Sequence, residues 1–471
     1  GVSGAKTHDG RAILANDMHL GISVPNTWYR AEMDYGSGRT TGVTLPGMPV
    51  FIAGGNDRLA WGGTNLTGDF LDLVSLEINP QNPDQYRVGD KWQPFEQISE
   101  TIRIKDAAPL QVTVRRSIWG PVAQEPLLGK PVAVHWSALD DTIVNLGLLD
   151  LDQAETLEQS MAVVNHTGGP QLNFLLADNQ GRIGWTVMGQ IPKRVGFDGS
   201  VSRSWADGKI GWDGYVDERQ LPRDIDPAAG ILVSANDRRL GKAYPHVIGR
   251  QFASGYRAYR ITQRLKEMPA INEGAMFGLQ LDTGNEFYGF YRQLALDVLS
   301  PKTIERQPEL QELRDTLRAW NGRADTDSLG FALLERFRRQ LAISVFSPFL
   351  EASRSMDKNF NYAWSYIDTP LQAMLTEKVP QLLPDSVHYH NWDDFILGQL
   401  TRSAQQLKTD YPDTALSELT WGQVNKARIG HPFSTAMPLL GVLLDMPADA
   451  LAGCANCVRA VGPAFGARQR L

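Results

Sequence analysis

The feature that most limits the possible folds is a change in apolar spacing near Tyr256. Before this point, short apolar runs are interrupted by glycine and proline, which is typical of strands and turns. After it, apolar residues recur at helical spacing over 256–268, 303–320 and 328–344. A chain that is strand-rich first, then helix-rich and finally mixed fits an α+β layered body with a helical excursion.

Two hairpins are predicted in the strand-rich part. Residues 99–120 hold alternating stretches on both sides of an Asp-Ala-Ala-Pro turn, and 172–188 hold two more around Asp-Asn-Gln-Gly. The polar, Gly-rich stretch 194–217 is expected to be a loop. Other expected elements are strands over 73–78, 131–136 and 231–234, and a helix over 155–164.

Charge and hydropathy exclude two classes of protein. The formal net charge is −7, from 53 acidic against 46 basic residues, whereas a general nucleic-acid binder needs a basic surface. No apolar run approaches the roughly 18 residues that a membrane span requires. We therefore expect neither nucleic acid as a partner nor a membrane span.

Several residue pairs allow a chemical and a plain structural interpretation. Ser3–Lys6 and Ser355–Lys358 match the S-x-x-K spacing of serine β-lactamases, but no S-D-N or K-T-G follows, so coincidence is favoured. His388 and His390 would share one face of an extended segment and could bind a metal. A polar surface stretch is the favoured interpretation.

The two cysteines form a C-x-x-C, Cys454 and Cys457. A redox pair and half of a zinc site are the functional interpretations, but there is no second C-x-x-C and no βαβ pattern nearby. A local disulfide or two incidental thiols is therefore favoured.

Four groups of short motifs occur in order along the chain. The groups are V-S-G-A-K-T at 2–7 with L-A-N-D-M-H-L-G at 14–21, L-P-G at 45–47 with G-G-N-D-R-L-A-W-G-G-T-N at 54–65, V-S-A-N-D-R at 233–238 with G-Y-R-A-Y-R-I at 255–261, and R-I-G-H-P-F at 428–433 with G-P-A-F-G-A at 462–467. Together they resemble the catalytic chain of penicillin acylases and acyl-homoserine-lactone acylases, over nearly the whole sequence.

The resemblance implies the αββα sandwich of N-terminal-nucleophile hydrolases, with two stacked antiparallel sheets between helical layers. It implies a precursor that cuts itself to expose an N-terminal Ser, whose own α-amine acts as the base. Gly1 aligns with about the fifth residue of such a chain, so the Ser is expected four residues upstream. Ser3 aligns with an ordinary strand position, and the family's C-terminal segment is also expected to be missing.

The resemblance also assigns catalytic roles. His19 matches a residue near the nucleophile, and Asn65 matches the position whose backbone N–H contributes to the oxyanion hole. Asn236 matches the side-chain amide that is the second donor, and Arg257 matches an Arg that orients the amine and this Asn. Fixed donors of this kind stabilise the tetrahedral oxyanion of amide hydrolysis.

Two further sets of residues follow from the same resemblance. The walls of an apolar acyl pocket are expected at Leu20, Ala53, Thr67 and Leu172. A structural calcium ion is expected at Asp69, Asp72 and the backbone of Leu71, because carboxylates and carbonyls suit a hard cation. Within 245–251, no residue clearly matches a further Asp of the family's calcium site.

The expected activity is hydrolysis of a linear amide through an acyl-enzyme, with no organic cofactor. The expected partners are a small α chain from the same precursor and a small N-acylated substrate, in the periplasm or outside the cell. The expected division is a core over 1–260, a mainly helical insertion over 261–400 and a return to the core over 401–471. The alternatives are an inactive fragment of this fold and a periplasmic ligand-binding protein.

Overall fold

The computed structural model describes residues 1–18, 20–21, 23–36, 38–241, 244–358, 360, 364–427 and 429–461. The chain divides into two compact units, each with its own hydrophobic core. Unit 1 comprises Gly1–Asn16 and Arg30–Ala253, and unit 2 comprises Asp17–Tyr29 and Ser254–Leu471. The strand-rich and helix-rich parts of the sequence correspond to these units, and the α+β class is confirmed.

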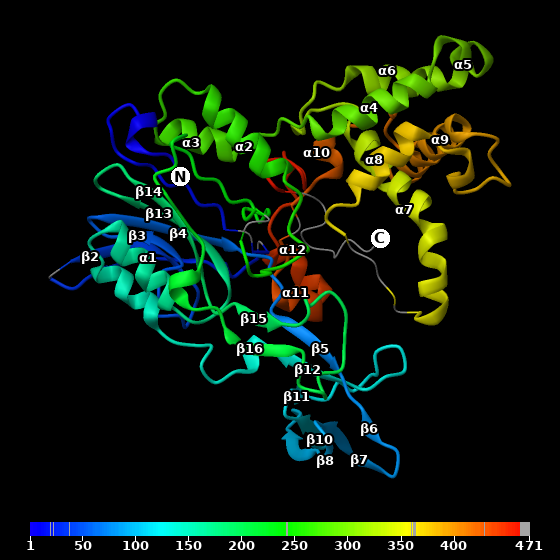
Figure 1. Cartoon of the computed structure of the whole chain (residues 1–471). Helices are drawn as coiled ribbons and strands as arrows, with labels where there is room; N and C mark the ends of the chain where they lie inside the picture. The colour runs from blue at the N-terminus through cyan, green and yellow to red at the C-terminus, as the bar shows by residue number, and fades with distance from the viewer. Residues whose placement is uncertain are drawn as a thin grey trace. The chain divides into compact units, whose positions relative to one another are not determined.

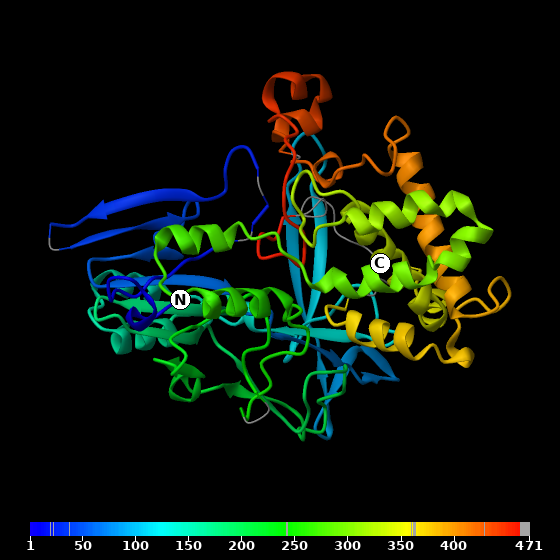
Figure 2. The same ribbon diagram turned by 90° about the horizontal axis from the view of Figure 1, so that it is seen from above.

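A seven-stranded sheet in the order β1-β2-β3-β4-β13-β14-β17 is the main element of unit 1 (Figure 1). From β2 to β17, neighbouring strands run antiparallel. The dark blue strands β1 and β2 form one edge, as Figure 2 shows from above. The strands are β1 (Tyr29–Asp34), β2 (Arg39–Thr44), β3 (Ala53–Gly55), β4 (Leu59–Asn65), β13 (Leu172–Asp178), β14 (Ile183–Met188) and β17 (Arg223–Ile225).

The sheet is covered on both faces, so β13 and β14 are buried along nearly their whole length. Helix α1 (Leu157–His166) lies on one face, where Leu157 and Met161 pack with Trp61 and Phe174. Its N-terminus carries the capping box of Thr156 and Gln159, which satisfies exposed backbone donors. On the other face, Leu175 and Ile183 pack with Leu232, next to the start of the chain.

Four smaller sheets complete unit 1. The predicted hairpin at 99–120 is confirmed as β9 and β10, and 172–188 as β13 and β14. The smaller sheets are built from β5 (Leu71–Ser75) with β12 (Val132–Trp136), β6 (Ile78–Asn79) with β7 (Asn82–Val88) and β8 (Lys91–Pro94), β9 (Glu96–Ile102) with β10 (Leu110–Ser117) and β11 (Gly120–Pro121), and β15 (Pro192–Val195) with β16 (Gly211–Tyr215).

The expectation of a loop over 194–217 is wrong at both ends. The segment is bounded by β15 and β16, which pair antiparallel and bring Arg194 opposite Trp212. Glycines with positive φ between these strands gave the stretch the composition of a loop. Arg194 and Trp212 both donate to Asp72 in β5, a contact that local sequence does not reveal.

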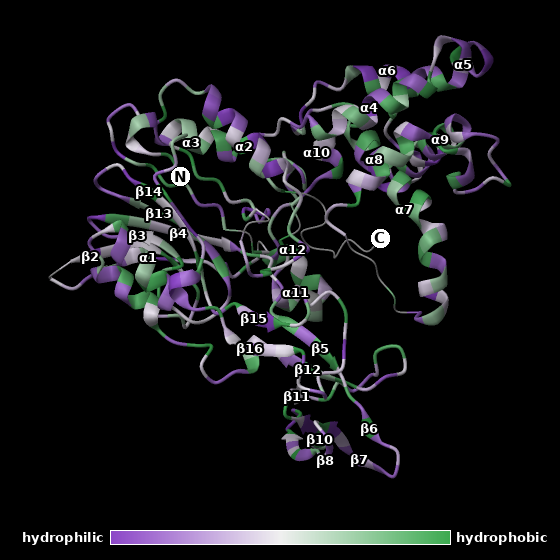
Figure 3. Ribbon diagram, in the orientation of Figure 1, coloured by the Kyte–Doolittle hydropathy of each residue, from purple (hydrophilic) through white to green (hydrophobic). Residues whose placement is uncertain are grey.

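Unit 2 is mainly helical. In Figure 3 the ribbon of α7 alternates between green and purple, as expected of a helix with one apolar side, and Phe331, Phe337 and Leu341 lie in the core of the unit. The helices of eight or more residues are α2 (Tyr256–Glu267), α3 (Glu273–Gln280), α4 (Phe287–Val298), α6 (Gln311–Ala319), α7 (Phe331–Met356), α8 (Asp368–Glu377) and α9 (Trp392–Asp410).

The helix expected over 303–320 is broken. Helix α5 (Pro301–Arg306) ends before Pro308, a short 3-10 turn follows, and α6 then begins at Gln311. Proline lacks the N–H that a continuous helix requires, and it disfavours helical backbone in the residue before it. Shorter helices α10 (Trp421–Val424), α11 (Pro432–Ala436) and α12 (Gly441–Leu444) follow later in the chain.

The cysteine pair forms a buried disulfide, Cys454–Cys457, with the amide nitrogen of Asn285 2.8 Å from the Cys454 sulfur. The interpretation as a local structural pair is thus favoured by the structure. Among the helices of the described residues, none combines the length and apolar composition needed to cross a membrane.

Candidate functional site

The first three residues lie antiparallel to residues 230–232, joined by backbone hydrogen bonds and an isolated bridge. The N-terminal amine of Gly1 donates to the Leu232 carbonyl at 2.8 Å, and Leu232 N–H donates back to the Gly1 carbonyl at 2.9 Å. Val2 lies opposite Ile231, and Ser3 N–H donates to Gly230. These bonds fix an antiparallel register between the first residues and the segment that leads to Asn236.

The two expected oxyanion donors lie together within unit 1. Asn236 Nδ2 donates to the backbone carbonyl of Asn65 at 2.9 Å. Thr64 lies one residue before Asn65, and Ser234 lies two residues before Asn236. The hydroxyls of Thr64 and Ser234 share a hydrogen bond of 2.7 Å. The segments that end at Asn65 and Asn236 are therefore joined at the place where the sequence predicts the site.

The backbone at this junction is left-handed at two residues other than glycine. Thr67 has φ 51° and Asn236 has φ 64°. Asparagine adopts this conformation at modest cost, but a β-branched threonine rarely does. Thr67 Oγ1 donates to Asn236 O at 3.0 Å, and Thr67 N–H donates to Asn65 Oδ1 at 2.9 Å. Such strained positions gather at functional sites, where the surroundings hold them in place.

The N–H of Asn65 points away from β13. Leu66 N–H donates to Gln171, and successive N–H groups along a strand point to opposite sides. On its other side, β4 pairs with β3 only over residues 60–62. The Asn65 N–H therefore emerges beyond the end of β3, as a backbone donor for an oxyanion must.

Asn173 is a member of this cluster that sequence analysis missed. Its side chain is buried, its amide nitrogen lies 3.3 Å from Asn65 O, and its Oδ1 accepts a hydrogen bond from Trp185 Nε1 at 3.1 Å. A single Asn within an otherwise apolar strand pattern was the available signal. Its partners come from distant parts of the chain, so the sequence could not show its role.

A largely buried positive charge lies beside the segment that leads to Asn236. The Arg239 guanidinium donates to the Val233 carbonyl and lies over the Trp185 ring, 4.8 Å from its centroid. Burial lowers the pKa of Arg239, and the carboxylates of Asp224 and Asp237 act in the opposite direction. This charge favours the neutral form of any amine held nearby.

The expected acyl-pocket residues do not share one surface. Ala53 pairs with Gly62 across β3 and β4, which places it on the face next to the start of the chain. Leu172 pairs with Asn65 and shares the opposite face with Phe174 and Leu176, which pack with α1. Strand neighbours in register lie on the same face, so the sheet separates Ala53 from Leu172.

The remaining predicted residues either belong to unit 2 or lie outside the residues that the structure describes. Leu20 is exposed in unit 2, and Arg257 is half-buried in the first turn of α2. His19, Arg428 and the motif at 462–467 lie outside the described residues. The catalytic roles of these residues stay predictions.

The expected calcium ligands already contact a guanidinium. Arg194 Nε donates to Asp72 Oδ2 at 2.8 Å, and Arg194 Nη2 donates to the Asp69 carbonyl at 3.0 Å. Asp69 Oδ1 lies 3.5 Å from the same Nη2. Calcium takes six to eight oxygen ligands, and a cation already lies among these oxygens. The donor set as arranged does not fit calcium.

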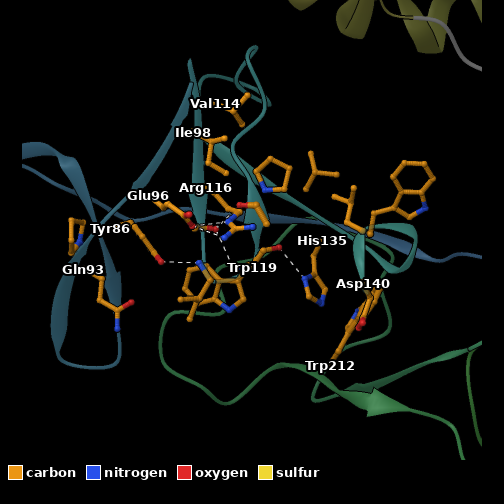
Figure 4. A pocket seen from close by; sticks show the side chains of 18 of the residues that line it. Tyr86, Gln93, Glu96, Ile98, Val114, Arg116, Trp119, His135, Asp140 and Trp212 are labelled. Carbon is orange, nitrogen blue, oxygen red and sulfur yellow. Dashed lines mark hydrogen bonds and ion pairs between the residues drawn. The ribbon is translucent and has the colours of Figure 1, made fainter. Parts of the chain in front are cut away.

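Unit 1 also contains a cavity of about 710 Å³, whose wall includes the Asp72 neighbours His135 and Trp212 (Figure 4). Tyr86, Trp119, His135 and Trp212 supply aromatic surface, and the ion pair of Arg116 with Glu96 lies at its wall. His135 Nδ1 is 2.9 Å from the Trp119 carbonyl. None of the predicted site residues lines this cavity.

Comparisons with known proteins agree with the motifs. The model of the penicillin amidase family matches residues 1–470. An acyl-homoserine lactone acylase, QuiP, from Pseudomonas aeruginosa is 28% identical over 72% of this chain and 43% of the relative. Penicillin acylase 2 proenzyme from Pseudomonas sp. strain SE83 is 26% identical over 98% of this chain and 58% of the relative. The chain thus spans about half the length of these relatives.

A solved structure supports the fold. A thermostable penicillin G acylase from Alcaligenes faecalis matches with a TM-score of 0.69 and 19% identity, over 88% of this chain and 78% of that chain. The expected N-terminal-nucleophile hydrolase fold is confirmed by this likeness.

Proposed function

Because this chain belongs to the penicillin amidase family, we propose that it forms the catalytic part of an amidohydrolase. The reaction is hydrolysis of a linear amide in a small N-acylated compound, through an acyl-enzyme on a serine upstream of Gly1. A small α chain from the same precursor completes the enzyme, in the periplasm or outside the cell.

The observation that carries this proposal is the register at the start of the chain. Gly1 pairs with Leu232, Val2 with Ile231 and Ser3 with Gly230. In an antiparallel pair, each step back along one strand is a step forward along the other. If the pairing continues, a residue four positions before Gly1 lies level with Asn236. The expected serine would then lie at the junction of Asn236 and Asn65.

The groups at this junction suit acyl transfer. The serine hydroxyl attacks the amide carbonyl while its α-amine takes the proton, which requires the amine in its neutral form. The Asn65 N–H and the Asn236 amide stabilise the oxyanion of the tetrahedral intermediate. Collapse of the intermediate transfers the proton to the leaving amine and leaves the acyl group on the serine. Water then releases the acid by the same steps.

Substrates within the N-acyl class differ in the length and aromaticity of the acyl group. The names of the relatives cover acyl-homoserine lactones and penicillins, which share an amide between an acyl group and a ring-bearing amine. A panel of amides that varies acyl length and aromaticity, assayed on the processed enzyme, measures the preference. A ligand-binding protein without activity would bind members of the panel and release no acid.

The role of Asn236 is tested by replacing it with glycine in the full processed enzyme. Glycine keeps the left-handed backbone and removes only the amide. We expect kcat to fall by about 10²–10³-fold with a smaller change in KM, as for the loss of one oxyanion donor. The matched control is Asn179→Gly at the exposed turn between β13 and β14, which should leave kcat unchanged.

Two measurements complete this test. Replacing the serine four residues before Gly1 with alanine should abolish self-cleavage and activity together. Mass spectrometry of the processed enzyme during turnover should detect the acyl group on that residue. An Asn236→Gly variant with the parent kcat would contradict the proposal, and so would turnover without the upstream serine.

A further inference from the structure

Asp72 is a buried carboxylate, and one of its two oxygens already accepts two hydrogen bonds from the protein. Its side chain is 5% exposed, and Oδ2 accepts hydrogen bonds from Arg194 Nε at 2.8 Å and from Trp212 Nε1 at 2.5 Å. Arg194 itself is only 3% exposed. A buried carboxylate with two N–H donors on one oxygen is held as an acceptor for the protein's own groups.

Asp69 completes the partners of the guanidinium. Arg194 Nη2 donates to the Asp69 carbonyl and lies 3.5 Å from its carboxylate. The Asp69 carboxylate also accepts a hydrogen bond from the backbone N–H of Leu71. Two carboxylates and a backbone carbonyl thus face one guanidinium, where the family resemblance implies that they face a divalent cation.

The surroundings are shaped for the arginine. Arg194 lies opposite Trp212 in the β15–β16 pair, and its guanidinium carbon is 5.7 Å from the centroid of the Trp212 ring. Next to Trp212 lies His135, with ring centroids 4.2 Å apart, and Figure 4 shows both on the wall of the aromatic cavity. A Cβ on Gly199 would come within 2.6 Å of Arg194 Nε, so this glycine leaves the space that the guanidinium needs.

We infer that Arg194 replaces calcium in this chain, as a built-in cation that joins residues 69–72 to the β15–β16 hairpin. A guanidinium has five N–H donors in a fixed planar arrangement and stays charged at every physiological pH, so it can neutralise carboxylates without a bound ion. Unit 1 therefore binds no calcium at Asp69 and Asp72, and its stability does not depend on calcium. The inference does not depend on the proposed activity, because its test measures stability and ion binding.

The test uses the full processed protein and three variants at Arg194. Thermal unfolding of the parent protein should be the same with a chelator and with added calcium. Arg194→Ala leaves the buried Asp72 carboxylate and the partly exposed Asp69 carboxylate around an empty space, so its Tm should fall by about 10 °C, the shift expected for a broken buried ion pair. Added calcium should restore part of that loss. Arg194→Met fills the space with a neutral chain, so its Tm should fall without a response to calcium.

A local readout separates this site from calcium elsewhere in the protein. Terbium(III) binds calcium sites and emits when a nearby tryptophan transfers energy to it, and Trp212 touches Asp72. Arg194→Ala should gain this emission relative to the parent protein, and Arg194→Ala/Trp212→Phe should lose the gain. The control is Arg116→Ala, at an exposed ion pair with Glu96. It should change Tm by no more than about a degree or two and leave the emission unchanged.

Two results would overturn the inference. One is a parent protein whose terbium emission is already high and falls in the variant Trp212→Phe, because the ion would then bind beside Arg194. The other is an Arg194→Ala variant with the parent Tm and no gain in emission. If Arg194→Ala does not fold, the parent measurements and Arg194→Lys decide, since lysine keeps the charge and should give an intermediate Tm without a calcium response.

Discussion

Gly199 is a residue at which backbone and packing requirements coincide. Its φ is 78°, and a Cβ would lie 2.6 Å from Arg194 Nε and 3.1 Å from Asp69 Oδ2. Gly208 has a similar φ of 71° with nothing within 4 Å of its Cβ position. Gly199→Ala should therefore cost about 1 kcal/mol for the backbone and about 2–4 kcal/mol more for the disturbed ion pair. Gly208→Ala should cost only the backbone part.

Chemical denaturation of both glycine variants measures this difference. The free energy of unfolding should be lower for Gly199→Ala than for Gly208→Ala, with equal m-values. Equal losses in the two variants would show that the space beside Arg194 is not needed.

For single residues, the sequence pointed to those that lie within recognisable motifs. It missed residues that are distinguished only by contacts with distant parts of the chain. Asn65 and Asn236 were located by their motifs, and the structure joins them by a hydrogen bond. Arg194 and Asn173 could not be found in this way. Arg194 meets Asp72 from 122 positions away, and Asn173 meets Asn65 from 108 positions away. Their local sequence shows a polar loop and a strand.

At the scale of elements, local periodicity was reliable wherever a turn and an alternating pattern occur together. The hairpins β9–β10 and β13–β14 and helix α1 were predicted close to their observed bounds. The hairpin β15–β16 was not predicted, because its glycines interrupt the alternating pattern of the strands. Its residue Arg194 contacts β5, which is distant in the sequence. Strand 231–234 was expected as a regular strand and forms only an isolated bridge to Val2.

A buried ion pair joins α2 to the turn after α3, and it gives unit 2 a pH-dependent stability. Asp282 is buried, which raises its carboxyl pKa, but hydrogen bonds from Arg260 and Gly284 N–H outweigh burial and lower the pKa below its usual value. Arg264 and Arg323 also face this carboxylate, each at 3.8 Å. A lowered pKa in the folded state means that the stabilisation is full above the ordinary carboxyl pKa. It is lost as the pH falls through the lowered value.

Asp282→Asn should therefore lower stability by about 3 kcal/mol at neutral pH. The gap between variant and parent should shrink at acid pH, below about pH 4. Unfolding experiments between pH 3 and 8 measure this difference in stability. The substitution Asp327→Asn, at an exposed residue, is the control and should behave like the parent. A gap that stays constant down to the acid end would exclude this ion pair as its source.

At the scale of the whole molecule, the chain has separate cores for its two units. Leu157 lies in a core of unit 1 and Leu341 in the core of unit 2, and both are fully buried. Each substitution to alanine should cost about 2–5 kcal/mol in the unit that contains it. Calorimetry should then show that Leu157→Ala lowers one unfolding transition and Leu341→Ala another. A single transition lowered equally by both would mean that the units unfold as one.

Unit 2 is built from two stretches that lie far apart in the sequence and are therefore synthesised at different times. Residues 17–29 belong to unit 2, but the remainder of that unit begins only at Ser254. A ribosome that adds about 5–20 residues per second needs roughly 10–45 seconds to make the stretch between them. During this interval the early segment has no unit to join, while its neighbours on both sides can already be folding.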